Sequence, residues 1–296
     1  MTVSNFTIGT ASIERIVESE EPLLDPFELY PDATPEAIAR QQRWLAPRFY
    51  DPASRLLVIA IQGFVVRSGG KVIVVDTCVG DCKKRRRSQF DGRDWGWLTR
   101  LGQAGVRPED VDYVVCTHFH VDHVGWNTRL AGGRWVPTFP NARYLFVREE
   151  WDFWLSERGM PGRSRTGDYV EDSVLPVAEA GLVDFVSADH RIDGSVSLAP
   201  APGHTPGLTV VHIRSAGNEA VLASDVLHSP LQLAYPHWST SFCADREQSR
   251  RTRLALLERW AGSGTLILPA HFPAPSAGRV HHQDDAYRFV FIQEAA

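Results

Sequence analysis

Four side chains of metal-binding type lie close together in the segment Thr117-His118-Phe119-His120-Val121-Asp122-His123. In an extended chain side chains alternate with period two, so His118 and His120 point to the same side and can share one ion. If the chain turns into a helix at Asp122, this carboxylate and His123 are redirected toward a second ion nearby. Imidazole and carboxylate groups are expected ligands for zinc and other first-row divalent metals, and no matching cysteine set indicates a purely structural site.

The segment contains the pattern His-x-His-x-Asp-His, and further motifs accompany it in the chain. These are Val75-Asp76-Thr77 before it, then Pro202-Gly203-His204-Thr205-Pro206-Gly207, Ser224-Asp225 and Pro269-Ala270-His271. In type and order they resemble the five motifs of the metallo-β-lactamase superfamily. Because the motifs span Asp76 to His271, the resemblance is specific.

The resemblance implies two divalent ions per chain, each held by three residues of its own and by one shared carboxylate. The first set is His118, His120 and His204, the second is Asp122, His123 and His271, and Asp225 would bridge the two ions. Zinc is the expected metal, although manganese, iron or cobalt accept the same ligands. Asp76 follows a buried strand, and we expect it to orient a ligand by a hydrogen bond rather than to bind metal.

Two ions about 3.5–4 Å apart can share a hydroxide, because metal binding lowers the pKa of water toward about 7. Such a site hydrolyses its substrate without a serine or cysteine nucleophile. We therefore expect a dinuclear-metal hydrolase that uses a metal-bridging hydroxide, with Asp122, Asp225 and His228 as catalytic residues. The resemblance also implies an αββα sandwich of two mixed sheets flanked by helices.

Secondary motifs resemble the lactonase and methyl-parathion-hydrolase-like group of the superfamily. They are Asp152-Phe153-Trp154-Leu155, Asp225-Val226-Leu227-His228 with Gln232, Pro269-Ala270-His271-Phe272-Pro273, and Tyr287-Arg288-Phe289. Acyl-homoserine lactonases typically place a tyrosine three residues after the bridging aspartate, whereas this chain has His228, as phosphotriesterase-like members do. The predicted reaction is therefore opening of a lactone or cleavage of a related small ester, with phosphotriester hydrolysis as a side activity.

Three residues are candidates for contact with a small, largely uncharged substrate. His228 either donates a hydrogen bond to a developing oxyanion or leaving group, or packs beside the metal ligands. Phe119 and Trp154 either form an apolar wall of the substrate site or belong to the core. Two other functions stay open: a β-lactam-hydrolysing enzyme, for which the sequence identifies no group that would receive the substrate carboxylate, and a metal-bearing binding protein without turnover.

The composition is that of a soluble globular protein, with 296 residues, 43% hydrophobic and 23% charged. A net charge of -5 gives no reason to expect nucleic acid or an anionic membrane as a partner. The basic run at residues 83–87 is expected to be solvated surface. We read Cys78 and Cys82 as free thiols, and we find neither a secretory signal nor a membrane-spanning segment. We therefore expect a cytoplasmic protein with a small-molecule substrate; the sequence is compatible with a homodimer and does not decide the oligomeric state.

The elements that must position these residues are predicted from periodicity and turn signals. Thr34-Pro35 starts a helix over 37–45, and Gly69-Gly70 joins strands at 56–66 and 71–75 into a hairpin. Further helices are expected at 97–104, 148–157 and 247–260, and further strands at 111–116, 208–213, 220–224, 265–269 and 287–292, the last at a sheet edge. Strands and helices alternate throughout, which agrees with one αββα domain over residues 1–296.

Overall fold

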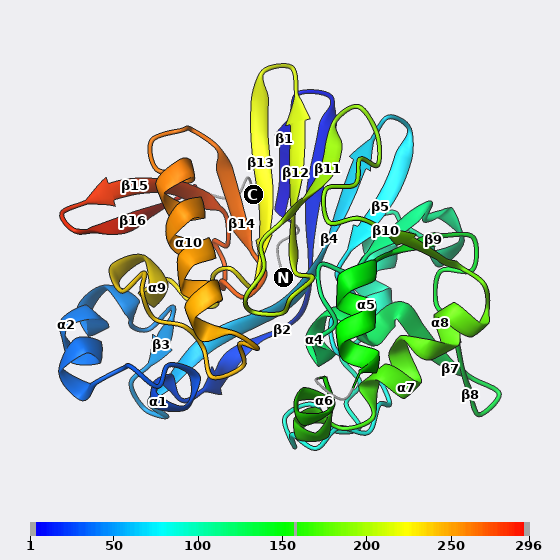
Figure 1. The fold of residues 1–296 in the computed structure, drawn as a ribbon, viewed down its shortest axis with the longest axis horizontal. Coiled ribbons are helices and arrows are strands. Elements are labelled where there is room, and N and C mark those ends of the chain that lie inside the picture. Colours follow the sequence, from blue (N-terminus) through cyan, green and yellow to red (C-terminus); the bar gives the residue numbers. More distant parts are fainter. Residues whose placement is uncertain (1–3, 157–158, 293–296) are drawn as a thin grey trace.

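The computed structural model describes residues 4–156 and 159–292, and in this part of the chain two sheets pack face to face with helices outside them (Figure 1). The α-helices are α1 Pro26–Leu29, α2 Pro35–Leu45, α3 Trp97–Gln103, α4 Val121–Val124, α5 Arg148–Leu155, α6 Met160–Thr166, α7 Tyr169–Ser173, α8 Leu175–Glu179, α9 Leu231–Ala234 and α10 Arg246–Trp260. Short 3-10 helices occur at Pro108–Asp110 and Gly125–Asn127. No helix in the described part is long and apolar enough to cross a bilayer.

The first sheet has the strand order β1-β2-β4-β5-β6-β9-β10, with β3 paired to β4. Its strands are β1 Ser4–Ile8, β2 Ala11–Leu24, β3 Tyr50–Asp51, β4 Leu56–Ser68, β5 Lys71–Val75, β6 Tyr113–Val115, β9 Arg143–Val147 and β10 Val183–Val186. The strands from β5 to β10 run parallel and the others antiparallel, so the sheet is mixed.

The second sheet has the order β11-β12-β13-β14-β15-β16 and is also mixed, because β13 and β14 are parallel. Its strands are β11 Val196–Pro200, β12 Thr209–Ser215, β13 Asn218–Ser224, β14 Leu266–Pro269, β15 Gly278–Gln283 and β16 Ala286–Phe291. A separate hairpin joins β7 Thr128–Ala131 to β8 Arg134–Pro137. As predicted, the last strand lies at an edge of its sheet.

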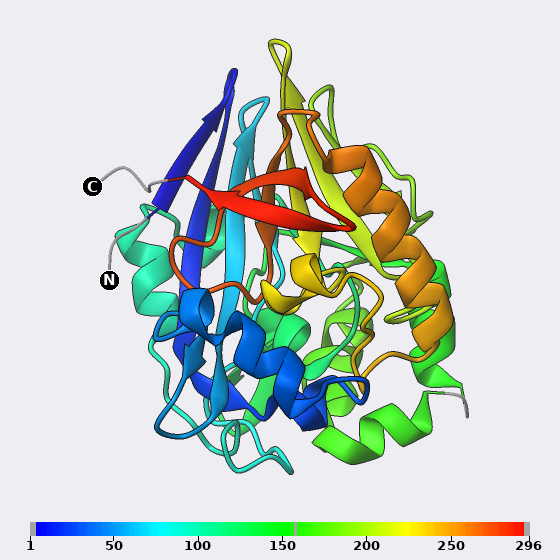
Figure 2. The same ribbon diagram turned by 90° about the vertical axis from the view of Figure 1, so that its left-hand side faces the viewer.

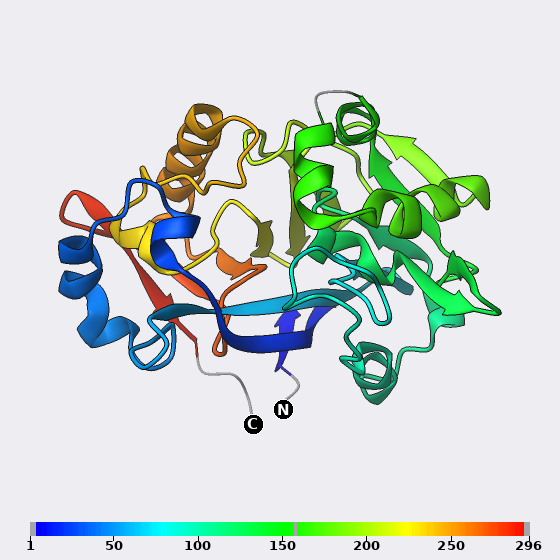
Figure 3. The ribbon, with the colours of Figure 1, turned by 90° about the horizontal axis from the view of Figure 1, so that it is seen from below.

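Three apolar layers hold the sheets and helices together. The middle layer joins the facing sides of the two sheets, with Val75 and Val115 from the first and Leu222 and Leu268 from the second. On the far side of the second sheet, Leu257 of α10 packs with buried residues of β12, β13 and β14 (Figure 2). A third cluster joins the outer face of the first sheet to the remaining helices except α6. The helices α4 to α8 lie on one side of the molecule (Figure 3). This arrangement confirms the predicted αββα sandwich.

The predicted elements are present, with small shifts at their ends. Thr34 caps α2 by accepting a hydrogen bond from the Ala37 amide at 3.2 Å. β4 and β5 form the predicted hairpin, with Ser68 paired to Lys71. β6 is shorter than predicted at both ends, and the end of the 148–157 helix prediction falls on Glu157, outside the described residues. The long β2 and the strands β1, β3, β7, β8, β9, β10, β11 and β15 were not predicted.

Candidate metal centre

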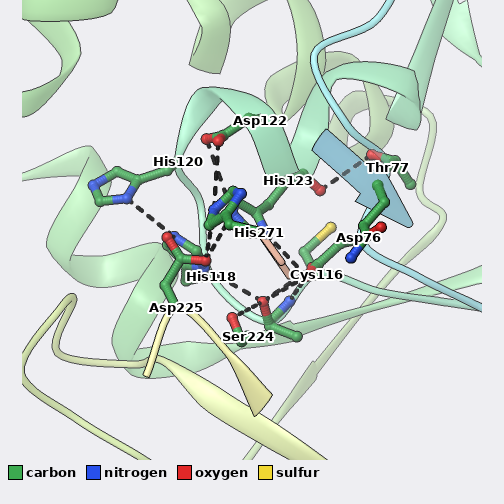
Figure 4. Close-up of polar contacts among 12 residues, drawn as sticks. Asp76, Thr77, Cys116, His118, His120, Asp122, His123, Ser224, Asp225 and His271 are labelled. Carbon is green, nitrogen blue, oxygen red and sulfur yellow. Dashed lines mark hydrogen bonds and ion pairs between the residues drawn. The ribbon is translucent and has the colours of Figure 1, made fainter. Parts of the chain in front are cut away.

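Most of the predicted ligands, together with Asp76, lie where four buried strands end, and His204 lies in the loop between β11 and β12. Asp76 follows β5, the segment from His118 follows β6, Asp225 follows β13, and His271 lies shortly after β14. β5 and β6 are parallel in one sheet and β13 and β14 are parallel in the other, so each pair delivers its residues to the same edge. The carboxyl ends of parallel strands are the usual position of ligand sites in such sheets. The sandwich thus brings residues far apart in sequence into one cluster (Figure 4).

The first predicted ligand set forms a compact group with one oxygen of Asp225. His120 Nδ1 lies 3.0 Å from His118 Nε2 and 2.8 Å from His204 Nε2. Asp225 Oδ2 lies 3.6 Å from His118 Nε2 and 3.1 Å from His204 Nε2. As expected for an extended segment, the side chains of His118 and His120 meet on one side. These four residues can enclose one metal ion.

The second predicted set gathers around the other oxygen of the same carboxylate. Asp225 Oδ1 lies 3.2 Å from His123 Nε2 and 3.0 Å from His271 Nε2. Asp122 Oδ2 lies 3.7 Å from His271 Nε2. The predicted turn into a helix occurs, because α4 begins at Val121 and redirects Asp122 and His123. Asp225 therefore stands between the two sets, with one oxygen toward each.

Hydrogen bonds on the far side of the rings hold the histidines in place. His123 Nδ1 donates to Asp76 Oδ2 at 2.9 Å, which is the orienting role predicted for Asp76. His271 Nδ1 donates to the Ala60 carbonyl at 2.9 Å. Partners of this kind fix the tautomer and leave the opposite nitrogen, Nε2, directed at the centre. The rings are thus preset for metal binding.

Local backbone geometry directs Asp225 into the centre. The pairing of β13 with β14 shifts register between Leu222 and Ser224, and Ser224 has a φ of 46°. A left-handed conformation is unfavourable for a residue with a side chain and persists only where the surroundings enforce it. Here Ser224 Oγ lies 2.7 Å from Thr117 Oγ1, and Thr117 donates its backbone N–H to Asp76 at 2.8 Å. This network ties the ends of β5, β6 and β13 together.

The charge distribution of the centre fits a bound cation. Burial lowers the pKa of His118 and His120 well below the ordinary value, which favours the neutral form that binds metal. Burial acts in the same direction on His123, His204 and His271, but the Asp225 carboxylate outweighs it and raises the pKa of all three. Burial would raise the pKa of Asp225, but the histidines around it, His271 and His123 first, hold that pKa well below its usual range. Among the described residues, neither Asp225 Oδ1 nor His123 Nε2 has a partner in hydrogen-bond geometry, although both atoms are buried. A divalent cation would satisfy both atoms and the buried negative charge.

A family model of the metallo-beta-lactamase superfamily matches residues 60–271. This chain belongs to the metallo-beta-lactamase superfamily. The N-acyl homoserine lactonase AttM of Rhizobium radiobacter is 28% identical over 134 residues, which are 44% of this chain and 46% of that protein. AttM of Azorhizobium caulinodans is 32% identical over 120 residues, 38% of this chain and 40% of that protein. The chain thus matches about half the length of these curated relatives or less.

Solved structures resemble the chain over nearly its whole length. The hydrolase AbOPH of the beta lactamase superfamily has a TM-score of 0.83 at 21% identity, covering 99% of this chain and 98% of its own. AidC, described as a dizinc quorum-quenching lactonase in complex with a homoserine product, has a TM-score of 0.77 at 22% identity with the same coverage. At this identity the likeness shows the fold, and it confirms the predicted sandwich.

A cavity of about 100 Å³ opens onto the candidate metal centre. His120, Asp122, Asp225, His228 and His271 form one wall of it, and apolar side chains from β2 and β4 form another. His228 is buried, and its Nε2 lies 3.1 Å from Asp225 Oδ2. The structure thus places His228 at the boundary between the ligands and the cavity.

The two aromatic residues predicted near the substrate have different positions. Trp154 packs edge-on against His120 with ring centroids 5.2 Å apart, and it lines a second cavity on the other side of that histidine. Phe119 is buried in the core against Phe146, at a centroid distance of 4.7 Å. Phe119 is absent from the described lining of either cavity because it alternates with His118 and His120 and points away from them.

Glu150 is a buried residue of the site that the sequence analysis did not single out. Its carboxylate accepts hydrogen bonds from the Phe119 amide at 2.8 Å, the Trp154 indole at 2.6 Å and the Gly207 amide at 3.0 Å. Gly207 permits this contact, since a Cβ there would lie 2.4 Å from the Glu150 nitrogen. Glu150 therefore joins α5 to both histidine loops. Its only sequence signal is an acidic residue on a Trp-rich helix.

The prediction that the basic run 83–87 is solvated surface is wrong for Lys83 and Arg85. Lys83 is fully buried, with Nζ 2.8 Å from Thr128 Oγ1 and 3.8 Å from the centroid of the Trp135 ring. Arg85 is also buried and binds the Asp172 carboxylate through both terminal nitrogens, at 2.6 and 3.0 Å. Asp172 is 87 residues away from Arg85 in sequence, so the neutralisation of the buried Arg85 charge by Asp172 could not be predicted. Cys78 and Cys82 are free, as predicted.

Proposed function

We propose that this protein is a dinuclear-metal hydrolase that opens a lactone or cleaves a related small carboxylic ester. The observation that carries the proposal is the position of Asp225, whose two oxygens face two separate ligand sets at the wall of a cavity. Two divalent ions, zinc by the chemistry of the ligands, would supply Lewis acidity and lower the pKa of a water molecule toward neutrality. The lactonases among its relatives support the choice of substrate.

The chain's own residues would orient the substrate and handle protons. Asp122 is half-buried and lines the cavity, so it is positioned both to hold an ion and to accept a proton at the free oxygen. His228 lines the same cavity and can donate a hydrogen bond to the oxygen that gains charge during cleavage. The apolar wall suits the carbon skeleton of a lactone and excludes competing water.

A substrate panel tests this proposal. Protein reconstituted with zinc is incubated with a γ-lactone, an aryl ester, a phosphotriester and a β-lactam, and the initial rates are compared. We expect the highest kcat/KM for the lactone or the ester, with slower turnover of the phosphotriester through the same centre. Preferential hydrolysis of the β-lactam, or binding of all four compounds without turnover of any, would contradict the proposal.

A further inference from the structure

Two arginine side chains line the cavity in front of the metal centre and have no described carboxylate partner. They are Arg87, at the end of the basic run, and Arg165, in the last turn of α6. Arg87 lies over the Phe242 ring at 5.0 Å, and Arg165 donates to the Ser241 carbonyl at 3.3 Å. The carboxylates that line this cavity, Asp122 and Asp225, both belong to the metal centre.

The segments that carry these arginines are fixed beside each other. The Arg86 amide donates to the Thr166 carbonyl at 3.1 Å, which joins the basic run to the end of α6. Burial alternates along the run: Lys83 and Arg85 point inward, Lys84 and Arg86 are exposed, and Arg87 is half-buried at the cavity. Because Asp172 anchors Arg85, the backbone before Arg87 is held in place. Arg87 is therefore presented to the cavity rather than free in solvent.

Two arginines without acidic partners are suited to bind a carboxylate. Guanidinium groups bind carboxylates through two parallel hydrogen bonds, and the interaction strengthens where apolar walls reduce the local dielectric. Two neighbouring arginines differ in that their charge is neutralised by an acidic side chain: Arg163 pairs with Glu171, and Arg85 pairs with Asp172. Arg87 and Arg165 have no such acidic partner among the described residues, so most of their N–H donors are open to a molecule in the cavity.

We infer that the substrate carries a carboxylate away from the bond that is cleaved, and that Arg87 and Arg165 bind this carboxylate while the reacting group lies at the metal centre. The inference rests on the proposed function for the identity of the cleaved bond. It replaces the expectation of a largely uncharged substrate with a lactone or ester that bears an acidic side chain. It also gives the basic run a role in specificity through its last residue.

Matched substrates and variants test the inference. The substrates are γ-lactones whose side chain of increasing length ends in a carboxylate, each paired with the corresponding primary amide. We expect kcat/KM to favour the best carboxylate over its amide by about tenfold or more, and Arg87→Met or Arg165→Met to remove most of this preference. Lys84→Met changes an exposed residue of the same run outside the cavity, so it should leave the preference unchanged.

A binding measurement keeps this inference separate from the proposed function. Calorimetry on the zinc-loaded protein compares adipate with its monoamide, which retains only one carboxylate and contains no ester. Tighter binding of adipate, lost in the Arg87→Met/Arg165→Met double variant, supports the inference even if no lactone is hydrolysed. Equal affinities for the two compounds, together with equal rates for carboxylate and amide lactones, would overturn it while leaving lactone hydrolysis intact.

Discussion

Asp225 is the residue on which the centre depends most, because each of its oxygens faces a different ligand set. In Asp225→Asn a neutral amide replaces the carboxylate, so one set loses its shared oxygen and the centre loses its bridging charge. We expect kcat/KM for the best substrate to fall by about 1000-fold or more. Steady-state kinetics at matched zinc content measure the effect.

A thiol near the centre provides the matched control. Cys243 Sγ lies 3.5 Å from His204 Nδ1, yet no step of the proposed reaction uses it. Cys243→Ser should therefore keep kcat/KM within about tenfold of the wild type. A loss as large as that of Asp225→Asn would instead point to an enzyme nucleophile and contradict the account.

Lys83 gives a prediction about stability at the same scale. Burial lowers the pKa of its amine from 10.5 to about 7. Between these values the unfolded chain binds more protons than the folded one, so this residue makes the free energy of unfolding rise with pH. From pH 7 to 10, we expect the free energy of unfolding of the wild type to rise relative to that of Lys83→Met. The rise should be a few kcal/mol, on the order of the free energy that corresponds to the pKa shift. Urea unfolding measures it; a difference that stays flat would show that Lys83 is not desolvated.

Among the elements, α5 determines how the two histidine loops meet. Glu150 of α5 accepts hydrogen bonds from both loops, and a glutamine there cannot accept all of them. We expect Glu150→Gln to weaken zinc binding by about 10–100-fold, as for other residues that hold metal ligands in position. Competition with a chromogenic chelator measures the affinity. Glu149→Gln, at the exposed neighbouring position, is the control, and equal affinities in the two variants would refute the role of Glu150.

Elements with a clear period were predictable from sequence, and those stabilised by distant partners were not. The hairpin of β4 and β5 has apolar strands and a Gly-Gly turn, and α10 has its buried Leu257 and Trp260 at helical spacing. β2 is different, because its charged residues suggest an exposed segment. Its Glu18 is nevertheless fully buried, where it accepts hydrogen bonds from the Val79 and Gly80 amides at 2.8 and 3.1 Å. Such partners arise only in the folded chain.

The candidate site divides in the same way between predictable and unpredictable parts. The spacing of ligand types from His118 to His123 is local, and the resemblance to the superfamily's motifs added His204, Asp225 and His271. The seven candidate ligands and the orienting role of Asp76 could therefore be proposed from sequence. The wall of the cavity is not local, because it combines side chains from β2, β4, the basic run and α6. For this reason the sequence could not decide between substrate wall and core for Phe119, and it did not indicate that Arg87 lines the cavity. Short motifs specify chemistry, whereas the sandwich specifies which surfaces surround it.

At the scale of the whole molecule, both sheets contribute residues to the metal centre. One sheet supplies the ligands after β6, while the other supplies Asp225 and His271 after β13 and β14. The shared apolar layer between them fixes how the residues of the two sheets meet at the centre. Metal binding at a site of this kind is coupled to folding, because the ligands converge only in the native state.

The most direct test of the central claim is to titrate the metal-free protein with zinc while measuring both bound metal and lactone hydrolysis. Because the ligands form two sets joined by one carboxylate, we predict that the rate rises until about two ions are bound per chain and then stays constant. Asp225→Asn should show little activity at any zinc concentration. Full lactone hydrolysis at one bound ion, or in protein freed of metal, would contradict the account.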